Sequence, residues 1–203
     1  HSPACIRNPD PAGNVRRQSG FREGNCLRGM APYENSKACA DLICQGYAKT
    51  FDLDIRIVRS SNVYGPGDLN SRIIPNTIRR LMAGKPALVW KGISYVREYM
   101  YIRDLVLGME MVMHAGKAGD IFNIGSGVLK TQEEVIEEIM SHFPRGVVES
   151  AAAPVYTKYE IQYQALDHSR ISQTLGWHPA TTFEEGIALT VNWWRDYANK
   201  KGR

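Results

Sequence analysis

A tyrosine and a lysine, Tyr33 and Lys37, stand four residues apart at the start of the stretch PYENSKACADLICQGYAKTF. Pro32 suits the first position of a helix, and residues four apart in a helix lie one turn apart on the same face. A free phenol is a poor base at neutral pH, because its ordinary pKa is about 10. A nearby ammonium group stabilises the phenolate, so such a pair could take a proton from an alcohol while a hydride leaves its carbon. The spacing alone is equally typical of an ordinary exposed helix start.

The sequence around this pair predicts an α/β fold. Apolar residues at helical spacing extend the first helix to about residue 50, and a β-branched run at 55–58 follows it. A helix followed by such a strand is half of a βαβ unit, which favours a parallel sheet. Short strands are expected at 87–90, 99–102, 120–125 and 163–166, and a helix is expected within IIPNTIRRLMAGK.

Helix-start signals place the remaining helices. Asp104 is expected to cap a helix that ends at Gly116, and Asp167 to cap one that ends at Gly176. Two capping boxes predict two more helix starts, and these are Thr131 with Glu134 and Thr182 with Glu185.

Composition narrows the class of protein. The chain has 203 residues, of which 43% are hydrophobic and 23% charged, which argues against disorder and fibrous repeats. A net charge of +4 without a long Lys/Arg run does not favour a nucleic-acid partner. Four cysteines without C-x-x-C spacing are interpreted as free thiols in a reducing compartment. No apolar run is long enough to span a membrane, no signal peptide is visible, and no histidine cluster has metal-ligand spacing. We therefore expect a cytoplasmic protein without a metal site.

The residues after the first helix strengthen the interpretation of Tyr33 and Lys37 as a catalytic pair. The predicted strand at 55–58 leads into RSSNVYGPGD, which holds the pattern Arg-x-x-Asn-x-Tyr-Gly-Pro. The helix and this strand together resemble the extended short-chain dehydrogenase/reductase family of nucleotide-sugar epimerases and dehydratases. VREYMYIRD, FNIGSG and LGWHP match later family segments in the same order, so the resemblance covers roughly residues 32–200. YGPGDLNSRIIPNTIR and YEIQYQALDHSRISQTLGW are most similar to the CDP-glucose 4,6-dehydratases within this family.

The resemblance implies roles for individual residues. Tyr33 would be the catalytic base and Lys37 its electrostatic partner, and both would bind the NAD cofactor at its nicotinamide ribose. Asn62, at the carboxyl end of a parallel strand, would touch the phosphate or the sugar of the substrate. Arg97 would pair with the diphosphate, for which a planar bidentate donor is suited; a surface salt bridge with a neighbour such as Glu98 is the alternative.

Other polar and aromatic residues are given structural interpretations. Asn123 is expected to hold a turn, and Trp177 and Trp193 to be core aromatics. Tyr64 could line the pocket or pack in the core. His168 and His178 are expected at the surface or in packing contacts, like most histidines outside a motif.

Two family features do not occur in the sequence: the Gly-x-x-Gly-x-x-Gly dinucleotide loop and the strand with a Ser or Thr and an Asp-Glu pair. The chain is therefore interpreted as a partial Rossmann-type parallel sheet whose N-terminal strands are missing, with a smaller α/β C-terminal substrate-binding domain. The expected division is an irregular leader at 1–29 whose place in the native fold is open, a Rossmann remnant at 30–67, and a mainly substrate-binding part at 68–203. The Tyr33 helix would then leave apolar surface exposed, the strand near residue 55 would be an open edge, and the chain alone would bind a dinucleotide weakly.

The function expected from the resemblance is an NAD-dependent nucleotide-sugar 4,6-dehydratase, CDP-glucose-like, in which Tyr33 takes the proton of the sugar 4-hydroxyl while NAD⁺ accepts the C4 hydride. A nucleotide-sugar 4-epimerase of the same family shares this first step and remains an alternative, as does a non-catalytic sugar-nucleotide-binding or interaction module. The expected partners are a nucleoside diphosphate sugar and, for full-length family members, a second copy in a homodimer, without nucleic acid or membrane.

Overall fold

The structure, a computed structural model, describes residues 20–27, 31–93, 95–153 and 162–201. The helices are α1 (Pro32–Phe51), α2 (Ile73–Met82), α3 (Ile102–Ala115), α4 (Gln132–Met140), α5 (Ser169–Leu175) and α6 (Phe183–Lys201). The strands are β1 (Ile57–Ser60), β2 (Asn62–Tyr64), β3 (Ala87–Lys91), β4 (Val96–Tyr101), β5 (Ile121–Ile124), β6 (Leu129–Thr131), β7 (Val148–Ala152) and β8 (Tyr163–Gln164). This element order confirms the predicted α/β class.

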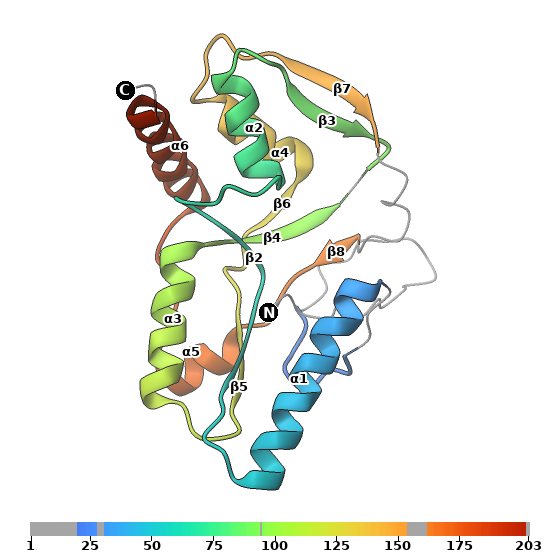
Figure 1. The fold of residues 1–203 in the computed structure, drawn as a ribbon, viewed down its shortest axis with the longest axis vertical. Helices are drawn as coiled ribbons and strands as arrows, with labels where there is room; N and C mark the ends of the chain where they lie inside the picture. The colour runs from blue at the N-terminus through green and yellow to red at the C-terminus, as the bar shows by residue number, and fades with distance from the viewer. Residues whose placement is uncertain (1–19, 28–30, 94, 154–161, 202–203) are drawn as a thin grey trace.

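Strand pairing is mainly parallel. β1 pairs with β5 and β3 pairs with β7, both in parallel. β4 lies at the centre of the largest sheet, where it pairs in parallel with β2 and β8 and antiparallel with β6. In Figure 1, β4 runs between an end of the molecule that contains α2, α4 and α6 and an end that contains α1, α3, α5 and β5.

The alternation of side chains along β4 separates two hydrophobic cores. Tyr99 and Tyr101 point into a core that contains residues of α2, α4 and α6. Met100 points to the other face and packs with Phe122 of β5 and Trp177. Because successive side chains of a strand point to opposite faces, one short strand supports both cores.

Helix α1 confirms its predicted position but buries little of its surface. Only Ala38 and Asp41 of this helix are buried. Several large apolar side chains remain exposed, and these are Leu42, Ile43, Tyr47 and Phe51. The expectation that this helix leaves apolar surface exposed is confirmed.

A buried ion pair fastens α1 to β1. Arg59 Nε lies 2.7 Å from Asp41 Oδ2, and Arg59 Nη2 donates to Asp41 Oδ1 at 3.1 Å. Both side chains are only 5% exposed. This bidentate pair therefore fixes the helix against the strand at the middle of its length.

Residues 20–27 belong to this part of the fold through specific hydrogen bonds. Phe21 N donates to Ala165 O at 2.9 Å, and Asp167 N donates to Phe21 O at 3.0 Å. Glu23 accepts from Asn123 N through its carboxylate and from the Arg59 guanidinium through its backbone carbonyl, each at 2.8 Å. Residues 1–19 and 28–30 lie outside the described residues, so the domain boundaries stay a prediction.

The helix-start signals at Thr131 and Thr182 are confirmed, whereas those at Asp104 and Asp167 are not. The Thr131 hydroxyl accepts from Glu134 N at 3.2 Å, and the Glu134 carboxylate accepts from Thr131 N at 2.6 Å, which confirms that capping box. Thr182 Oγ1 likewise accepts from Glu185 N at 3.1 Å. Asp167 was wrongly expected to cap α5, because the N-cap position is His168. Asp167 lies one residue earlier, and its Oδ1 accepts from Ser169 N at 2.9 Å.

Asp104 was wrongly expected to cap α3. The helix begins at Ile102, and its N-cap position is Tyr101. The buried Asp104 carboxylate accepts instead from Ala180 N at 3.3 Å and from Thr181 N at 2.9 Å. The side chain thus ties the segment before α6 to α3.

Two further expectations concern the cysteines and the membrane. Cys26, Cys39 and Cys44 are free thiols, as predicted, and Cys5 lies outside the described residues. In the part of the chain that the structure describes, no helix is long and apolar enough to cross a membrane.

Candidate functional site

Strand register places the predicted ligand residues on one face of the central sheet. Asn62 of β2 is paired with Tyr99 of β4, and Gln164 of β8 is paired with Arg97 of β4. Paired residues point to the same face, and so do residues two apart along one strand. Asn62, Arg97 and Gln164 therefore share a face, although they come from three segments far apart in the sequence.

Asn62 is held by two hydrogen bonds. Its Nδ2 donates to the backbone carbonyl of Glu98 at 3.1 Å and to Gln164 Oε1 at 3.0 Å. Asn62 is half-buried, whereas Gln164 is only 4% exposed. The side chain of Asn62 is therefore fixed by the sheet at the carboxyl end of β1, where open α/β folds bind ligands.

Glu98 is not the salt-bridge partner of Arg97. Its carboxylate is completely buried and accepts from Gly127 N and Leu166 N, each at 2.7 Å. Burial raises the pKa of the Glu98 carboxyl above its usual range, and these backbone hydrogen bonds oppose that rise. Glu98 thus binds two loops on the opposite face of β4, while Arg97 lies on the face of Asn62 with its guanidinium 4.7 Å from the Tyr95 ring centroid.

Tyr33 and Lys37 are brought together as their spacing predicts. Lys37 Nζ lies 5.4 Å from the centroid of the Tyr33 ring. Tyr33 is 60% exposed and Lys37 is half-buried, so both can meet a ligand from solution. Glu34 stabilises this helix start by accepting a hydrogen bond from Ala31 N at 3.3 Å.

The course of the chain places this pair at the ligand end of β1. Tyr33, Lys37 and Asp41 follow one another at four-residue spacing along one face of α1, and Asp41 contacts Arg59 of β1. Figure 1 shows that α1 and the strand segment after it run in opposite directions, with the N-terminal end of α1 toward β8. The first turn of α1 and the carboxyl end of β1 are therefore at the same end. Asn62 does not bond to Tyr33 or Lys37 directly.

Sequence reasoning missed two polar residues here, Ser61 and Gln164. Ser61 is 5% exposed, and its Oγ has no hydrogen-bond partner among the described residues. A buried hydroxyl without a partner is costly, and its place next to Asn62 fits a group that meets a ligand. The pair of serines in RSSN was a signal for Ser61, whereas nothing local in the sequence indicates that Gln164 meets Asn62.

The aromatic and amide residues with structural interpretations lie in the cores. Tyr64 is 4% exposed, donates to Phe183 O at 3.3 Å and packs against Tyr99, and its burial raises the pKa of the phenol far above the usual value. Of the two readings of Tyr64, the packed one is correct. Asn123 donates through Nδ2 to Phe21 O at 2.7 Å and holds that segment in place. Trp177 is buried at 3% exposure, as expected.

The three remaining residues with predicted positions differ in burial, and Trp193 was expected in the core but only packs against its edge. Trp193 is only partly buried and stacks on Tyr197 with ring centroids 4.9 Å apart. His178 is exposed. His168 meets Trp177 edge-on, and burial lowers the pKa of its imidazole.

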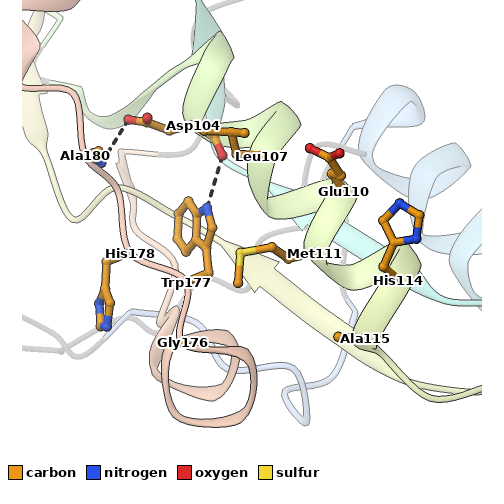
Figure 2. Close-up of a pocket in the computed structure, with 10 residues that line it drawn as sticks. All are labelled: Asp104, Leu107, Glu110, Met111, His114, Ala115, Gly176, Trp177, His178 and Ala180. Atoms are coloured by element: carbon orange, nitrogen blue, oxygen red, sulfur yellow. Dashed lines mark hydrogen bonds between the residues drawn. The ribbon is translucent and has the colours of Figure 1, made fainter.

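A pocket of about 500 Å³ lies elsewhere, between α3 and the segment 176–180 (Figure 2). Figure 2 shows the hydrogen bonds that close its upper wall, from Trp177 Nε1 to Asp104 O and from Ala180 N to the Asp104 carboxylate. None of Tyr33, Lys37, Asn62 and Arg97 lines it. The polar groups of this wall already bond to one another, so we assign the pocket no role in the site.

The sequence is similar to a known protein family and to curated proteins. Residues 10–125 match the NAD dependent epimerase/dehydratase family. A dTDP-glucose 4,6-dehydratase of Streptomyces antibioticus is 33% identical over 168 residues, which are 82% of this chain and 49% of the relative. The chain thus spans about half the length of the curated relatives that it resembles.

The structure is also similar to solved structures. The chain is similar to a dTDP-glucose 4,6-dehydratase of Bacillus anthracis in complex with NAD, with a TM-score of 0.83 and 28% identity over 92% of this chain and 59% of that one. A UDP-glucose 4-epimerase of Thermotoga maritima with UDP-glucose has a TM-score of 0.80 at 24% identity, over 91% of this chain and 60% of that one, a likeness of fold alone. This protein belongs to the NAD dependent epimerase/dehydratase family.

Proposed function

We propose that this chain carries the nucleotide-sugar-binding and proton-transfer residues of an NAD-dependent nucleotide-sugar 4,6-dehydratase. One observation carries the proposal: the Tyr33–Lys37 pair lies at the same end of β1 as Asn62 and Arg97. A base and an anion-binding side chain at one end of a parallel sheet suit a substrate that has both an alcohol and a diphosphate.

Each residue has a distinct task in this proposal. Arg97 binds the diphosphate through its planar guanidinium, and Asn62 contacts the part of the substrate next to it. Tyr33 takes the proton of the sugar 4-hydroxyl, and the Lys37 ammonium stabilises the phenolate that does so. The loops that Glu98 holds keep β4, and with it Arg97, in place.

The residues of this chain suit the nicotinamide end of the NAD cofactor. Tyr33 and Lys37 would hold the nicotinamide ribose, and the orphan Ser61 hydroxyl at the carboxyl end of β1 is a further polar group on that side. When bound, NAD⁺ supplies the hydride acceptor for C4 of the sugar and returns the hydride at a later stage. No residue of this chain is assigned to the diphosphate of the dinucleotide.

Dehydration is favoured over epimerisation by the curated relatives. The Streptomyces antibioticus relative is named for a 4,6-dehydratase, and an Arabidopsis thaliana relative, 29% identical over 86% of this chain and 26% of its own length, is named for UDP-glucose 4,6-dehydration among other activities. The similarity of two segments to CDP-glucose 4,6-dehydratases makes CDP-glucose the substrate that we propose. The names of the relatives make dTDP-glucose and UDP-glucose its competitors.

Calorimetric titration of the chain with CDP-, dTDP- and UDP-glucose tests the proposal. We expect CDP-glucose to bind most tightly, and Arg97→Ala to weaken its binding about tenfold or more, because a hydrogen-bonded ion pair to phosphate is lost. Arg103→Ala, which removes an exposed arginine of α3, should leave the affinity unchanged.

The outcomes of this titration separate the parts of the proposal. Equal affinity of the Arg97→Ala variant would remove Arg97 from the site. Tighter binding of dTDP- or UDP-glucose would show that the nucleotide of the substrate is not CDP. A wild-type chain that binds none of the three nucleotide sugars would contradict the proposed function.

A further inference from the structure

The orientation of the Asn62 side chain follows from the backbone beside it. A backbone carbonyl is only an acceptor, so the amide atom 3.1 Å from Glu98 O must be Nδ2 and not Oδ1. The same Nδ2 lies 3.0 Å from Gln164, and the atom that faces it must therefore be Oε1. Both hydrogens of Asn62 Nδ2 are then engaged within the protein.

One hydrogen-bond acceptor and one donor remain on the ligand face, which is the face of the sheet shared by Asn62, Arg97 and Gln164. Asn62 Oδ1 receives no hydrogen bond from the described residues, and it can only accept. Gln164 Nε2, which points away from Asn62, can only donate. Arg97, paired with Gln164 in register, adds a cation to the same face.

We propose that Gln164 is a positioning residue of the nucleotide-sugar site, which holds Asn62 with its oxygen toward the ligand, so that Asn62 accepts a hydrogen bond from a sugar hydroxyl. This inference rests on the proposed function and narrows it. Asn62 then contacts the sugar, whereas cationic side chains bind the phosphate. A phosphate oxygen next to Asn62 Oδ1 would place two acceptors in contact without a proton between them.

Turning Asn62 around to donate to a phosphate would be costly. Its Oδ1 would then face the carbonyl of Glu98 and Oε1 of Gln164, and two hydrogen bonds in a largely buried place would be lost. Because Gln164 is 4% exposed and belongs to β8, it cannot readily move aside. Gln164 therefore determines which atom of Asn62 the substrate meets.

The test compares a ligand with and without the sugar. The affinities of the chain for CDP-glucose and for CDP are measured by calorimetry, and their ratio reports the contribution of the glucose. Gln164→Met, which fills similar space without an acceptor, should lower this ratio about fivefold to tenfold, because Asn62 is no longer held as an acceptor. Gln164→Glu keeps the acceptor oxygen and should keep the ratio even if both affinities shift. Gln173→Met, the same change at an exposed position of α5, should alter neither affinity.

A second readout uses the ligand-free chain. In nuclear magnetic resonance spectra, both Asn62 side-chain amide hydrogens should exchange slowly with solvent in the wild type and in Gln164→Glu. One of them should exchange fast in Gln164→Met, because its acceptor is gone.

The outcomes separate this inference from the proposed function. An unchanged ratio in Gln164→Met, or an equal loss of affinity for CDP and CDP-glucose, would overturn the positioning role. Fast exchange of both Asn62 amide hydrogens in the wild type would overturn the orientation itself. If the wild-type chain binds neither ligand, the proposed function fails, and amide exchange alone decides how Asn62 is oriented.

Discussion

Tyr33→Phe should lower the rate of 4-keto sugar formation by about 10²–10⁴-fold, which is the usual contribution of a positioned general base. The change removes one oxygen and keeps the ring, so the contact of Lys37 with the ring and the start of α1 should persist. Tyr33 is 60% exposed, and its hydroxyl supports no packing whose loss could explain a slower reaction. The rate is measured as the absorbance of the keto sugar in base, with CDP-glucose and with NAD⁺ in large excess.

The same helix offers a matched control for this substitution. Tyr47 is 56% exposed and lies further along α1, so Tyr47→Phe makes the same chemical change away from the proposed site. It should leave the rate unchanged. Affinity for the nucleotide sugar should stay within about twofold in both variants, since the proton transfer concerns the transition state more than binding. A Tyr33→Phe variant that turns over like the wild type would exclude Tyr33 as the base.

Asp41→Ala should destabilise the chain by about 3–5 kcal/mol, because it leaves the buried Arg59 guanidinium without its carboxylate. The pair is bidentate and 5% exposed on both sides, and it is the contact that fastens α1 to β1. The free energy of unfolding is measured by urea denaturation followed by circular dichroism. Loss of this pair should also weaken turnover, since α1 carries Tyr33.

An exposed ion pair serves as the control. Arg22 is 72% exposed and lies 3.0 Å from Asp167, so Arg22→Ala should cost at most about 1 kcal/mol. The double change Asp41→Leu with Arg59→Met should recover much of the stability lost in Asp41→Ala, because it removes the unpaired charge. If Asp41→Ala costs no more than Arg22→Ala, the ion pair does not fasten the helix.

The elements that sequence reasoning predicted correctly are those with local signals. Pro32 and the apolar spacing that follows it predicted α1, and the Thr131–Glu134 pair predicted α4. The arrangement of Tyr33 and Lys37 was predictable for the same reason, since a helix alone brings residues four apart together. The family motifs added the roles of Asn62 and Arg97, which remain proposals.

What could not be predicted depends on contacts between distant segments. Asp104 has the sequence signal of a helix cap, yet its partners are Ala180 and Thr181, more than seventy residues away. Gln164 meets Asn62 only because β8 and β2 lie along β4 in a particular register. Neither register nor long-range partners can be read from residue types, and the orientation of Asn62 follows from both.

We propose that Tyr33 and the sheet face formed by Asn62, Arg97 and Gln164 bind one substrate molecule. A crystal structure of the chain with bound CDP-glucose tests this claim most directly. We expect the diphosphate on the Arg97 guanidinium, a sugar hydroxyl on Asn62 Oδ1, and the glucose 4-hydroxyl within hydrogen-bonding distance of the Tyr33 hydroxyl. A complex whose diphosphate contacts Arg97 while its 4-hydroxyl lies out of reach of Tyr33 would contradict the proposed role of Tyr33.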